Sequence, residues 1–191
     1  MRVGEVRRRT KETDVRVRLN LDGSGEARVD TGIKFLDHLL AALAKHSCFD
    51  LEVSARGDLE HHVAEDVMIA LGSALEKALG EKTGIRRMGD AVLPMDDALV
   101  LVAVDLSGRA YADIDVKFAK KRLDDLSSDL IEHLLQTLAA NGKLNLHVQT
   151  LRGRNDHHKA EAIFKALGVA LAEAVSEEPK RRGVPSTKGV L

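Results

Sequence analysis

The sequence predicts an α+β fold made of two pseudo-symmetric repeats, each a β-β-α-β-α unit whose helices pack on one face of its sheet. Two observations predict the duplication. An acidic-His-Leu-Leu motif occurs at residues 37–40 and again at 132–135, an offset of 95. A His-His-x-x-Glu motif occurs at 61–65 and again at 157–161, an offset of 96. Chance similarity between Leu-rich helices is the alternative, and it is disfavoured because the matches include His, Glu and Gly as well as apolar residues.

Each repeat begins with a strand pattern. Residues 12–21 and 97–106 carry Val or Leu at alternate positions, which is the period of a strand with one buried face. Glycine-containing turns follow at 23–25 and 107–108, and each leads into a second strand-like segment. These two segments per repeat are the expected strands before the first helix.

The helices follow from the spacing of their apolar residues. Residues 36–43 place Leu at helical intervals, and residues 67–78 do the same with Val, Ala and Leu, without proline. A third strand pattern, at 51–53 and again at 146–148, separates the two helices of each unit. We therefore expect one domain over 1–191, with repeats at approximately 1–84 and 85–180 and a C-terminal tail at 181–191.

Composition limits the function classes. The 191 residues are 44% hydrophobic and 31% charged with a net charge of -1, which suits a globular chain without a general affinity for nucleic acid or membranes. No apolar run is long enough to span a bilayer, and no Trp and only one Tyr are present for base stacking. The single Cys48, which we expect in the core, cannot form an intramolecular disulfide. We expect a cytoplasmic protein with no nucleic-acid or membrane partner.

The duplicated histidines have the spacing of metal ligands. His61 and Glu65 stand at i and i+4 on one helix face, while His62 is rotated by about 100° and suits a different ion. The same holds for His157, Glu161 and His158. Together with two lone helix histidines, the candidate metal ligands are His38, His61, His62, Glu65, His133, His157, His158 and Glu161.

These ligands divide by symmetry into two sites of four. One set is His61, Glu65, His133 and His158; the other is His38, His62, His157 and Glu161. The two repeats of a site could belong to one subunit or to neighbouring subunits. Imidazole with carboxylate favours Mn²⁺, with Zn²⁺ or Fe²⁺ as possible substitutes. A single helix histidine is more often a surface or core residue, and it is the recurrence that favours metal.

The remaining histidines do not recur. His46 follows the first helix and could line the site, whereas His147 lies in a strand pattern and is expected to be structural. An anion could be bound by Arg86, Arg87, Arg109, Lys165 and the tail segment Ser186-Thr187-Lys188-Gly189, where ammonium and hydroxyl groups could form charge-assisted hydrogen bonds.

Motifs along the whole chain resemble those of the imidazoleglycerol-phosphate dehydratase family. They are Arg9-Thr10-Lys11-Glu12-Thr13, Thr31-Gly32-Ile33 with Phe35 and Asp37-His38, His61-His62-Val63-Ala64-Glu65-Asp66, Pro94-Met95-Asp96-Asp97-Ala98-Leu99, Asp105-Leu106-Ser107-Gly108-Arg109, His157-His158 with Glu161, and Pro185-Ser186-Thr187-Lys188-Gly189-Val190-Leu191. One departure is a shortened Gly57-Asp58-Leu59-Glu60 stretch before His61, which we expect to shorten a loop without affecting the ligands.

The resemblance implies a carbon-oxygen lyase of L-histidine biosynthesis. Such an enzyme dehydrates D-erythro-imidazoleglycerol phosphate to imidazoleacetol phosphate and water, through an imidazolate bound by two Mn²⁺ ions per active site. The resemblance also implies a ribosomal protein S5 domain 2-like duplication and a homo-oligomer of twenty-four subunits.

The resemblance also assigns residue roles. It implies the eight metal ligands above, and Glu12, Glu65 and Glu161 as catalytic candidates, with Glu12 as the acid or base. The expected substrate contacts are Glu12, His38, His46, His61, His62, Glu65, Arg87, Arg109, His157, His158, Lys165, Ser186, Thr187 and Lys188.

Two other functions fit the metal pattern. A binuclear metallohydrolase acting on a phosphoester would release free phosphate from the same substrate. A metal-storage or scaffold protein would need the ligands but neither Glu12 nor the tail.

Overall fold

The computed structural model describes residues 1–191. The first repeat contains β1 (Val3–Arg9), β2 (Thr13–Asn20), β3 (Ala27–Asp30), α1 (Lys34–Ser47), β4 (Asp50–Gly57) and α2 (Glu60–Leu79). The second contains β5 (Met88–Met95), β6 (Ala98–Asp105), β7 (Tyr111–Asp115), β8 (Arg122–Leu123), β9 (Leu126–Ser127), α3 (Asp129–Gly142), β10 (Asn145–Arg152) and α4 (Asp156–Val175).

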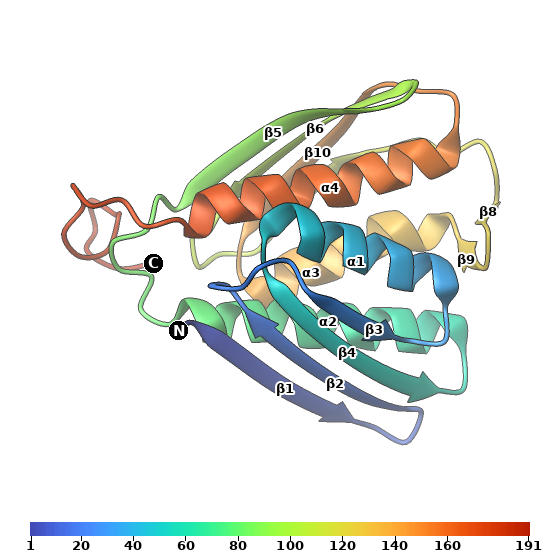
Figure 1. Ribbon diagram of the computed structural model, residues 1–191, viewed down its shortest axis with the longest axis horizontal. Helices are drawn as coiled ribbons and strands as arrows, with labels where there is room; N and C mark the ends of the chain where they lie inside the picture. Colours follow the sequence, from blue (N-terminus) through green and yellow to red (C-terminus); the bar gives the residue numbers. More distant parts are fainter.

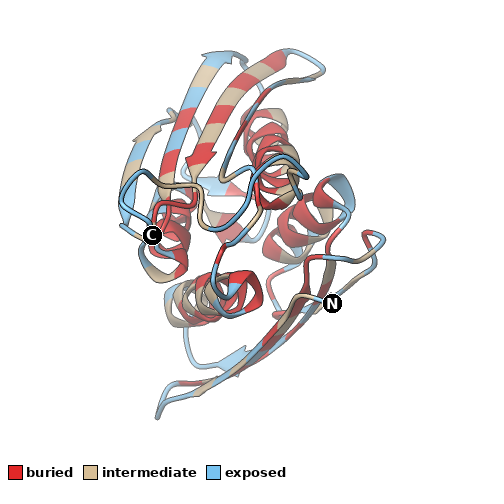
Figure 2. Cartoon of the chain, turned by 90° about the vertical axis from the view of Figure 1, so that its left-hand side faces the viewer, coloured by how far each residue is buried: buried red, intermediate tan, exposed pale blue.

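The chain forms two sheets with the four helices between them (Figure 1). The sheet orders are equivalent, β1-β2-β4-β3 and β5-β6-β10-β7, and in each the last pair is parallel and the others are antiparallel. Helix α2 packs on β1 and β2, α4 packs on β5 and β6, and helices of different repeats meet as α1 with α4 and α2 with α3. Apolar side chains of all these elements form one buried cluster, while the outer sheet faces are largely exposed (Figure 2).

The predicted duplication is confirmed. Helices α1 and α3 are offset by 95 residues, α2 and α4 by 96, and β2 and β6 by 85. Each repeat begins with one strand that the sequence pattern did not indicate, β1 and β5 respectively, so the unit common to both repeats is β-β-β-α-β-α; the second repeat also contains the short strands β8 and β9. Both are edge strands with few buried positions. Strand β1 has three arginines among its seven residues, so the alternation of apolar and polar residues that identifies a strand is not visible in its sequence.

Two equivalent glycines allow these edge strands to lie against the helices. A Cβ on Gly4 would stand 1.9 Å from the Ala74 carbonyl oxygen, and one on Gly89 would stand 2.2 Å from the Ala170 carbonyl oxygen. Both obstacles are helix backbone, which cannot move aside cheaply. Glycine at these positions therefore sets the distance between strand and helix in both repeats.

The connection between β7 and α3, residues 116–128 with β8 and β9, is much longer than its counterpart at 31–33 in the first repeat. Asp125 in this insertion accepts hydrogen bonds from the backbone N–H groups of Lys34 and Phe35 at 2.6 and 2.8 Å, and so caps α1 of the other repeat. Glu60 at the start of α2 accepts from the Ser127 N–H at 2.6 Å. The insertion thus holds together the ends of the helices that carry the histidines.

The prediction that Cys48 packs in the core was wrong. Cys48 is exposed, because it ends α1 in the left-handed conformation with φ of 59°, which turns the chain away from the helix. None of the helices has the length and apolar character needed to cross a membrane.

Candidate metal centres and anion pocket

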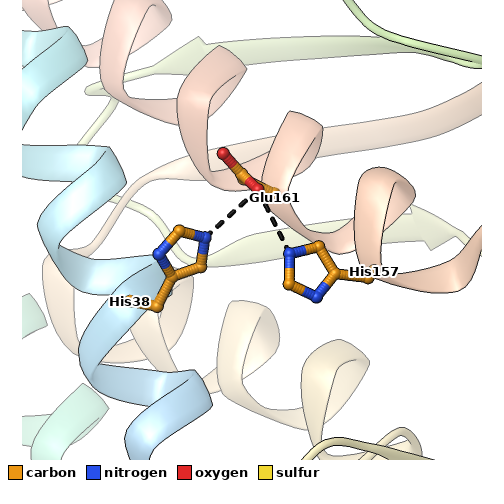
Figure 3. Close-up of side chains that lie close together, drawn as sticks. All are labelled: His38, His157 and Glu161. Atoms are coloured by element: carbon orange, nitrogen blue, oxygen red, sulfur yellow. Dashed lines mark ion pairs between the residues drawn. The ribbon is translucent and has the colours of Figure 1, made fainter.

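The first histidine cluster joins the two repeats. His38 on α1 and His157 on α4 both direct Nε2 at Glu161 Oε2, at 3.1 and 3.3 Å (Figure 3). His157 and Glu161 lie one helical turn apart on α4, and the packing of α1 against α4 brings His38 to them. We call His38, His157 and Glu161 cluster A.

A second cluster repeats this arrangement with the roles of the repeats exchanged. His133 on α3 directs Nε2 at Glu65 Oε1, at 3.0 Å, and His61 Nε2 lies 3.9 Å from Glu65 Oε2. We call His61, Glu65 and His133 cluster B. Within each cluster the potential ligand atoms lie within 4.8 Å of one another, close enough to share one ion.

The two remaining histidines of the motifs lie outside these clusters. His62 Nδ1 lies 2.9 Å from Asp58 Oδ1 and 3.7 Å from Glu12 Oε2, and His158 Nδ1 lies 2.7 Å from Asp97 Oδ1. The structure therefore brings together three of the four residues in each predicted set, and the fourth points elsewhere within the protomer, as its 100° rotation requires.

Carboxylates hold several of the imidazole rings by Nδ1. Asp124 Oδ2 lies 3.3 Å from His157 Nδ1, in addition to the Asp58 and Asp97 contacts of the other two histidines. A ring that donates from Nδ1 to a carboxylate presents Nε2 as the free acceptor, which is the usual orientation of a metal-ligating histidine. The donor set and its orientation thus fit divalent metal ions.

The two glutamates at the centres of the clusters differ in environment. The side chain of Glu161 is 10% exposed and that of Glu65 is 35% exposed. Lys165 Nζ lies 2.7 Å from Glu161 Oε1, and Ile69 stands at the equivalent place in the first repeat. Burial raises the pKa of Glu161, but hydrogen bonds from Lys165 and His38 outweigh it and lower the pKa to about 2. Only cluster A has a cation beside its carboxylate.

Lys165 and His46 belong to the surroundings of cluster A. Lys165 is engaged with Glu161 and with Met95 Sδ at 3.2 Å, so it lies apart from the other predicted phosphate contacts of the same protomer. His46, near the end of α1, is exposed; burial of part of its ring and the nearby charge of Lys165 lower its pKa, while Glu161 opposes the shift. His147 is exposed on β10 and lies beside Tyr111, with ring centroids 5.6 Å apart and the ring planes tilted by 39°, and it belongs to neither cluster.

The predicted tail forms a pocket with residues that precede β5 and follow β6, and we call it the anion pocket because its charged side chains are all cationic. The Arg87 guanidinium donates to the Asp105 carboxylate at 2.6 and 3.0 Å and to the Pro185 carbonyl at 2.9 Å, which fixes the tail to the domain. The cavity has a volume of about 540 Å³ and is lined by Arg87, Arg109, Arg181, Pro185, Ser186, Thr187, Lys188 and Leu191. A larger hollow on the outer face of the first sheet contains no histidine.

The pocket and the clusters lie at opposite ends of the protomer. His157 is in the first turn of α4, whereas the Arg87 N–H donates to the Ala174 carbonyl in its last turn. At about 1.5 Å rise per residue, the 20 residues of α4 separate these ends by roughly 30 Å. Figure 1 shows the tail beyond the C-terminal end of α4 and the β8–β9 hairpin at the other end.

Sequence patterns missed several residues of these sites. Asp97 stands 85 positions after Glu12, so the repeat itself could have indicated it. Asp124 lies in the unduplicated insertion, and Arg181 lies in a charged segment typical of solvated surface; neither had a signal in the sequence. The shortened stretch before His61 is a two-residue loop at 58–59, and cluster B forms behind it.

Fold and sites together define a class of protein: a duplicated α+β chain with paired histidine-glutamate clusters and a separate anion pocket. Comparison with known proteins then gives the family. The family model described as imidazoleglycerol-phosphate dehydratase matches residues 31–171. The chain belongs to the imidazoleglycerol-phosphate dehydratase family, whose members are hydro-lyases of histidine biosynthesis.

Individual relatives agree over the full length. The imidazoleglycerol-phosphate dehydratase of Dehalococcoides mccartyi is 54% identical over 191 residues, which are 100% of this chain and 97% of the relative. That of Methanothermobacter thermautotrophicus is 52% identical over 96% of this chain and 95% of its own. Crystal structures of the enzymes from Staphylococcus aureus and Pyrococcus furiosus both match with a TM-score of 0.85. Their identities are 32% and 40%, and they cover 92% and 97% of this chain and 99% and 100% of their own.

Proposed function

We propose that the chain dehydrates D-erythro-imidazoleglycerol phosphate to imidazoleacetol phosphate and water. The single observation that supports this best is the pair of clusters A and B, which are related by the internal repeat. Two equivalent sites suit a ligand with two equivalent donor atoms, and the two nitrogens of an imidazole ring are such a pair. The relatives' names carry the same substrate.

We propose Mn²⁺ as the ion of both sites, with Zn²⁺ or Fe²⁺ as possible substitutes. Cluster A would hold one ion and cluster B the other, through the histidine Nε2 atoms and the glutamate carboxylates. When bound, the two ions would supply Lewis-acid chemistry that favours the imidazolate form of the substrate ring and helps expel the hydroxyl group on the attached carbon.

Glu12 is the proposed acid or base. Its carboxylate is 57% exposed and its nearest charged partner is His62 Nδ1 at 3.7 Å, so it is free to accept a proton from the substrate or return one. Glu65 and Glu161 were expected to be catalytic as well. Their carboxylates are engaged by the histidines of their own clusters, and this supports a role in holding the ions.

The anion pocket is the proposed phosphate site. Arg109, Lys188 and Arg181 provide positive charge there, and the hydroxyl groups of Ser186 and Thr187 provide donors. The Arg87 guanidinium already binds Asp105 and the tail carbonyl, so its main contribution is to hold the pocket together. Binding the phosphate end fixes the substrate's position while the ring is at the metal ions.

We propose that each active site is shared between subunits of a homo-oligomer, with twenty-four subunits expected from the family resemblance. Support comes from the separation of roughly 30 Å within a protomer, which is longer than a substrate of this size can span. His62 and His158, which join neither cluster of their own protomer, would then complete the sets of a neighbouring copy. The biosynthetic role also favours a cytoplasmic location.

The product identifies the reaction. Metal-stripped protein would be given Mn²⁺ and imidazoleglycerol phosphate, and the products would be followed while the mass in solution is measured. A phosphorylated ketone formed only with metal supports the proposal. Free inorganic phosphate would indicate a metallohydrolase instead, and metal binding without turnover would indicate a storage protein.

A further inference from the structure

Glu12 lies in the tight connection between β1 and β2, and a buried carboxylate on α2 anchors this connection. Asp66, one turn after His62, is 7% exposed. Its Oδ1 accepts from Arg8 Nε at 2.7 Å, and its Oδ2 accepts a short hydrogen bond from the Thr13 hydroxyl. Asp66 therefore binds residues on both sides of Glu12.

The hydroxyl groups of this connection form a directed chain. An ionised carboxylate can only accept, so the Thr13 hydroxyl donates to Asp66 and accepts from the Thr10 hydroxyl, 3.1 Å away. The lone pairs of Thr10 Oγ1 then accept the backbone N–H groups of Glu12 and Thr13, both at 3.0 Å. On the other side the Glu12 carbonyl accepts from the Asp58 N–H at 3.2 Å. The backbone of Glu12 is fixed at both ends, whereas its carboxylate accepts no hydrogen bond and lies beside His62, at 3.7 Å from Nδ1.

The second repeat lacks this anchor. Leu93, Ala98 and Ala162 stand where the first repeat has Arg8, Thr13 and Asp66. Asp97, the counterpart of Glu12, is held by its own carboxylate, which accepts from the Arg154 and Asn155 N–H groups at 2.6 and 3.0 Å and contacts His158. One repeat immobilises the carboxylate; the other immobilises only the backbone behind it.

We propose that Asp66 is a positioning residue that acts through Thr13 and Thr10 to hold the backbone of Glu12, so that the free Glu12 carboxylate is presented beside His62. The inference rests on the proposed role of Glu12. Apolar residues at these positions would have served stability alone, and in the second repeat Leu93, Ala98 and Ala162 all belong to or pack against the apolar core. The buried charge and the directed hydroxyl chain occur only where the carboxylate has to remain unbound.

The test uses variants that each change one group in the chain of hydrogen bonds. Asp66→Asn allows the side-chain amide to donate to the Thr13 hydroxyl, which reverses the direction of these hydrogen bonds. Thr13→Val removes the hydroxyl while keeping shape and strand propensity, and Thr13→Ser restores the hydroxyl. Asp14→Asn is the matched control, because Asp14 pairs with Arg7 at 2.9 Å on the exposed face of the same hairpin. Turnover, KM and bound metal would be measured for each, alone and combined with Glu12→Gln.

We expect kcat of Asp66→Asn and Thr13→Val to fall by about tenfold or more, with KM within about threefold and the metal content unchanged. Thr13→Ser and Asp14→Asn should keep kcat within about threefold. In the Glu12→Gln background neither Asp66→Asn nor Thr13→Val should lower kcat further, because a residue that acts through Glu12 has nothing left to position.

Two results would overturn the inference while leaving the proposed function intact. One is an unchanged kcat in both Asp66→Asn and Thr13→Val. The other is a further fall in kcat, by the same factor as in the unsubstituted background, when either change is added to Glu12→Gln. Full turnover in Glu12→Gln would remove Glu12 from the mechanism, and Asp66 with it. If the unsubstituted protein performs no dehydration, hydrogen exchange of the Glu12 amide still decides the anchoring. Exchange that is no faster in Thr13→Val than in Thr13→Ser would contradict it.

Discussion

Glu65 and Glu161 stand at equivalent positions of the two repeats, yet Glu161 Oε1 lies 2.7 Å from a lysine and Glu65 has no such partner. The internal symmetry places a carboxylate in each cluster, and Lys165 then distinguishes one from the other. Cluster A is the more buried and the more strongly paired of the two. The two proposed metal sites are therefore similar in ligands and different in electrostatics.

This difference predicts a pH dependence of stability. Burial raises the pKa of Glu161, but Lys165 and His38 lower it from 4.5 to about 2. A lowered pKa in the folded state contributes stability that is fully present above the unfolded value and is lost as pH falls towards 2. In metal-free protein, Glu161→Gln should be less stable than the unsubstituted protein at pH 6, with the gap closing by up to about 3 kcal/mol near pH 2. Urea unfolding at a series of pH values measures the gap, and a gap independent of pH would contradict this assignment.

Separate clusters predict separate metal losses. His61→Ala removes one ligand of cluster B and none of cluster A, so the variant should lose one ion per protomer and retain the other. His38→Ala should do the reverse. Calorimetric titration with Mn²⁺, together with the metal content after dialysis, measures both. Loss of both ions from either single variant would show that the clusters do not act as two sites.

The anion pocket predicts a defect in substrate binding. Arg109→Ala and Lys188→Ala should each raise KM by about tenfold or more with little change in kcat, because contacts to the phosphate are present in both ground and transition states. Arg182→Ala, in the same tail but outside the pocket lining, is the control. A fall in kcat with unchanged KM would place these residues in the chemical step instead.

The contact between strand and helix predicts a large effect from one methyl group. Gly4→Ala would place a Cβ 1.9 Å from the Ala74 carbonyl oxygen, so the edge strand or the helix must shift. We expect the free energy of unfolding to fall by roughly 2 kcal/mol or more. Glu5→Ala, on the exposed face of the same strand, should change it by less than about 0.5 kcal/mol. Equal stability of the two variants would contradict the close packing at Gly4.

Much of the fold and the site could be predicted because duplicated motifs carry information that single motifs lack. One histidine in a helix does not indicate a metal site, whereas His61 and His157, which recur in the same His-His-x-x-Glu motif, together indicate one. Edge strand β1 was missed because its arginines conceal the alternation, and the insertion at 116–128 was missed because its counterpart at 31–33 in the other repeat is much shorter. Asp66 appeared in a motif, but its function depends on a neighbour 53 positions away, Thr13, which no local pattern indicates.

Subunit mixing tests the shared active site most directly. One variant, Arg109→Ala with Lys188→Ala, would disable the pocket, and another, His61→Ala with His157→Ala, would disable both clusters. Each would be assayed at low substrate concentration alone and after dissociation and joint reassembly, with mixed oligomers verified by native mass spectrometry. Random assembly should restore at most about one quarter of unsubstituted activity, because one pairing in four joins an intact cluster to an intact pocket. Verified mixed oligomers with no more activity than the two variants assayed separately would contradict a site built between subunits.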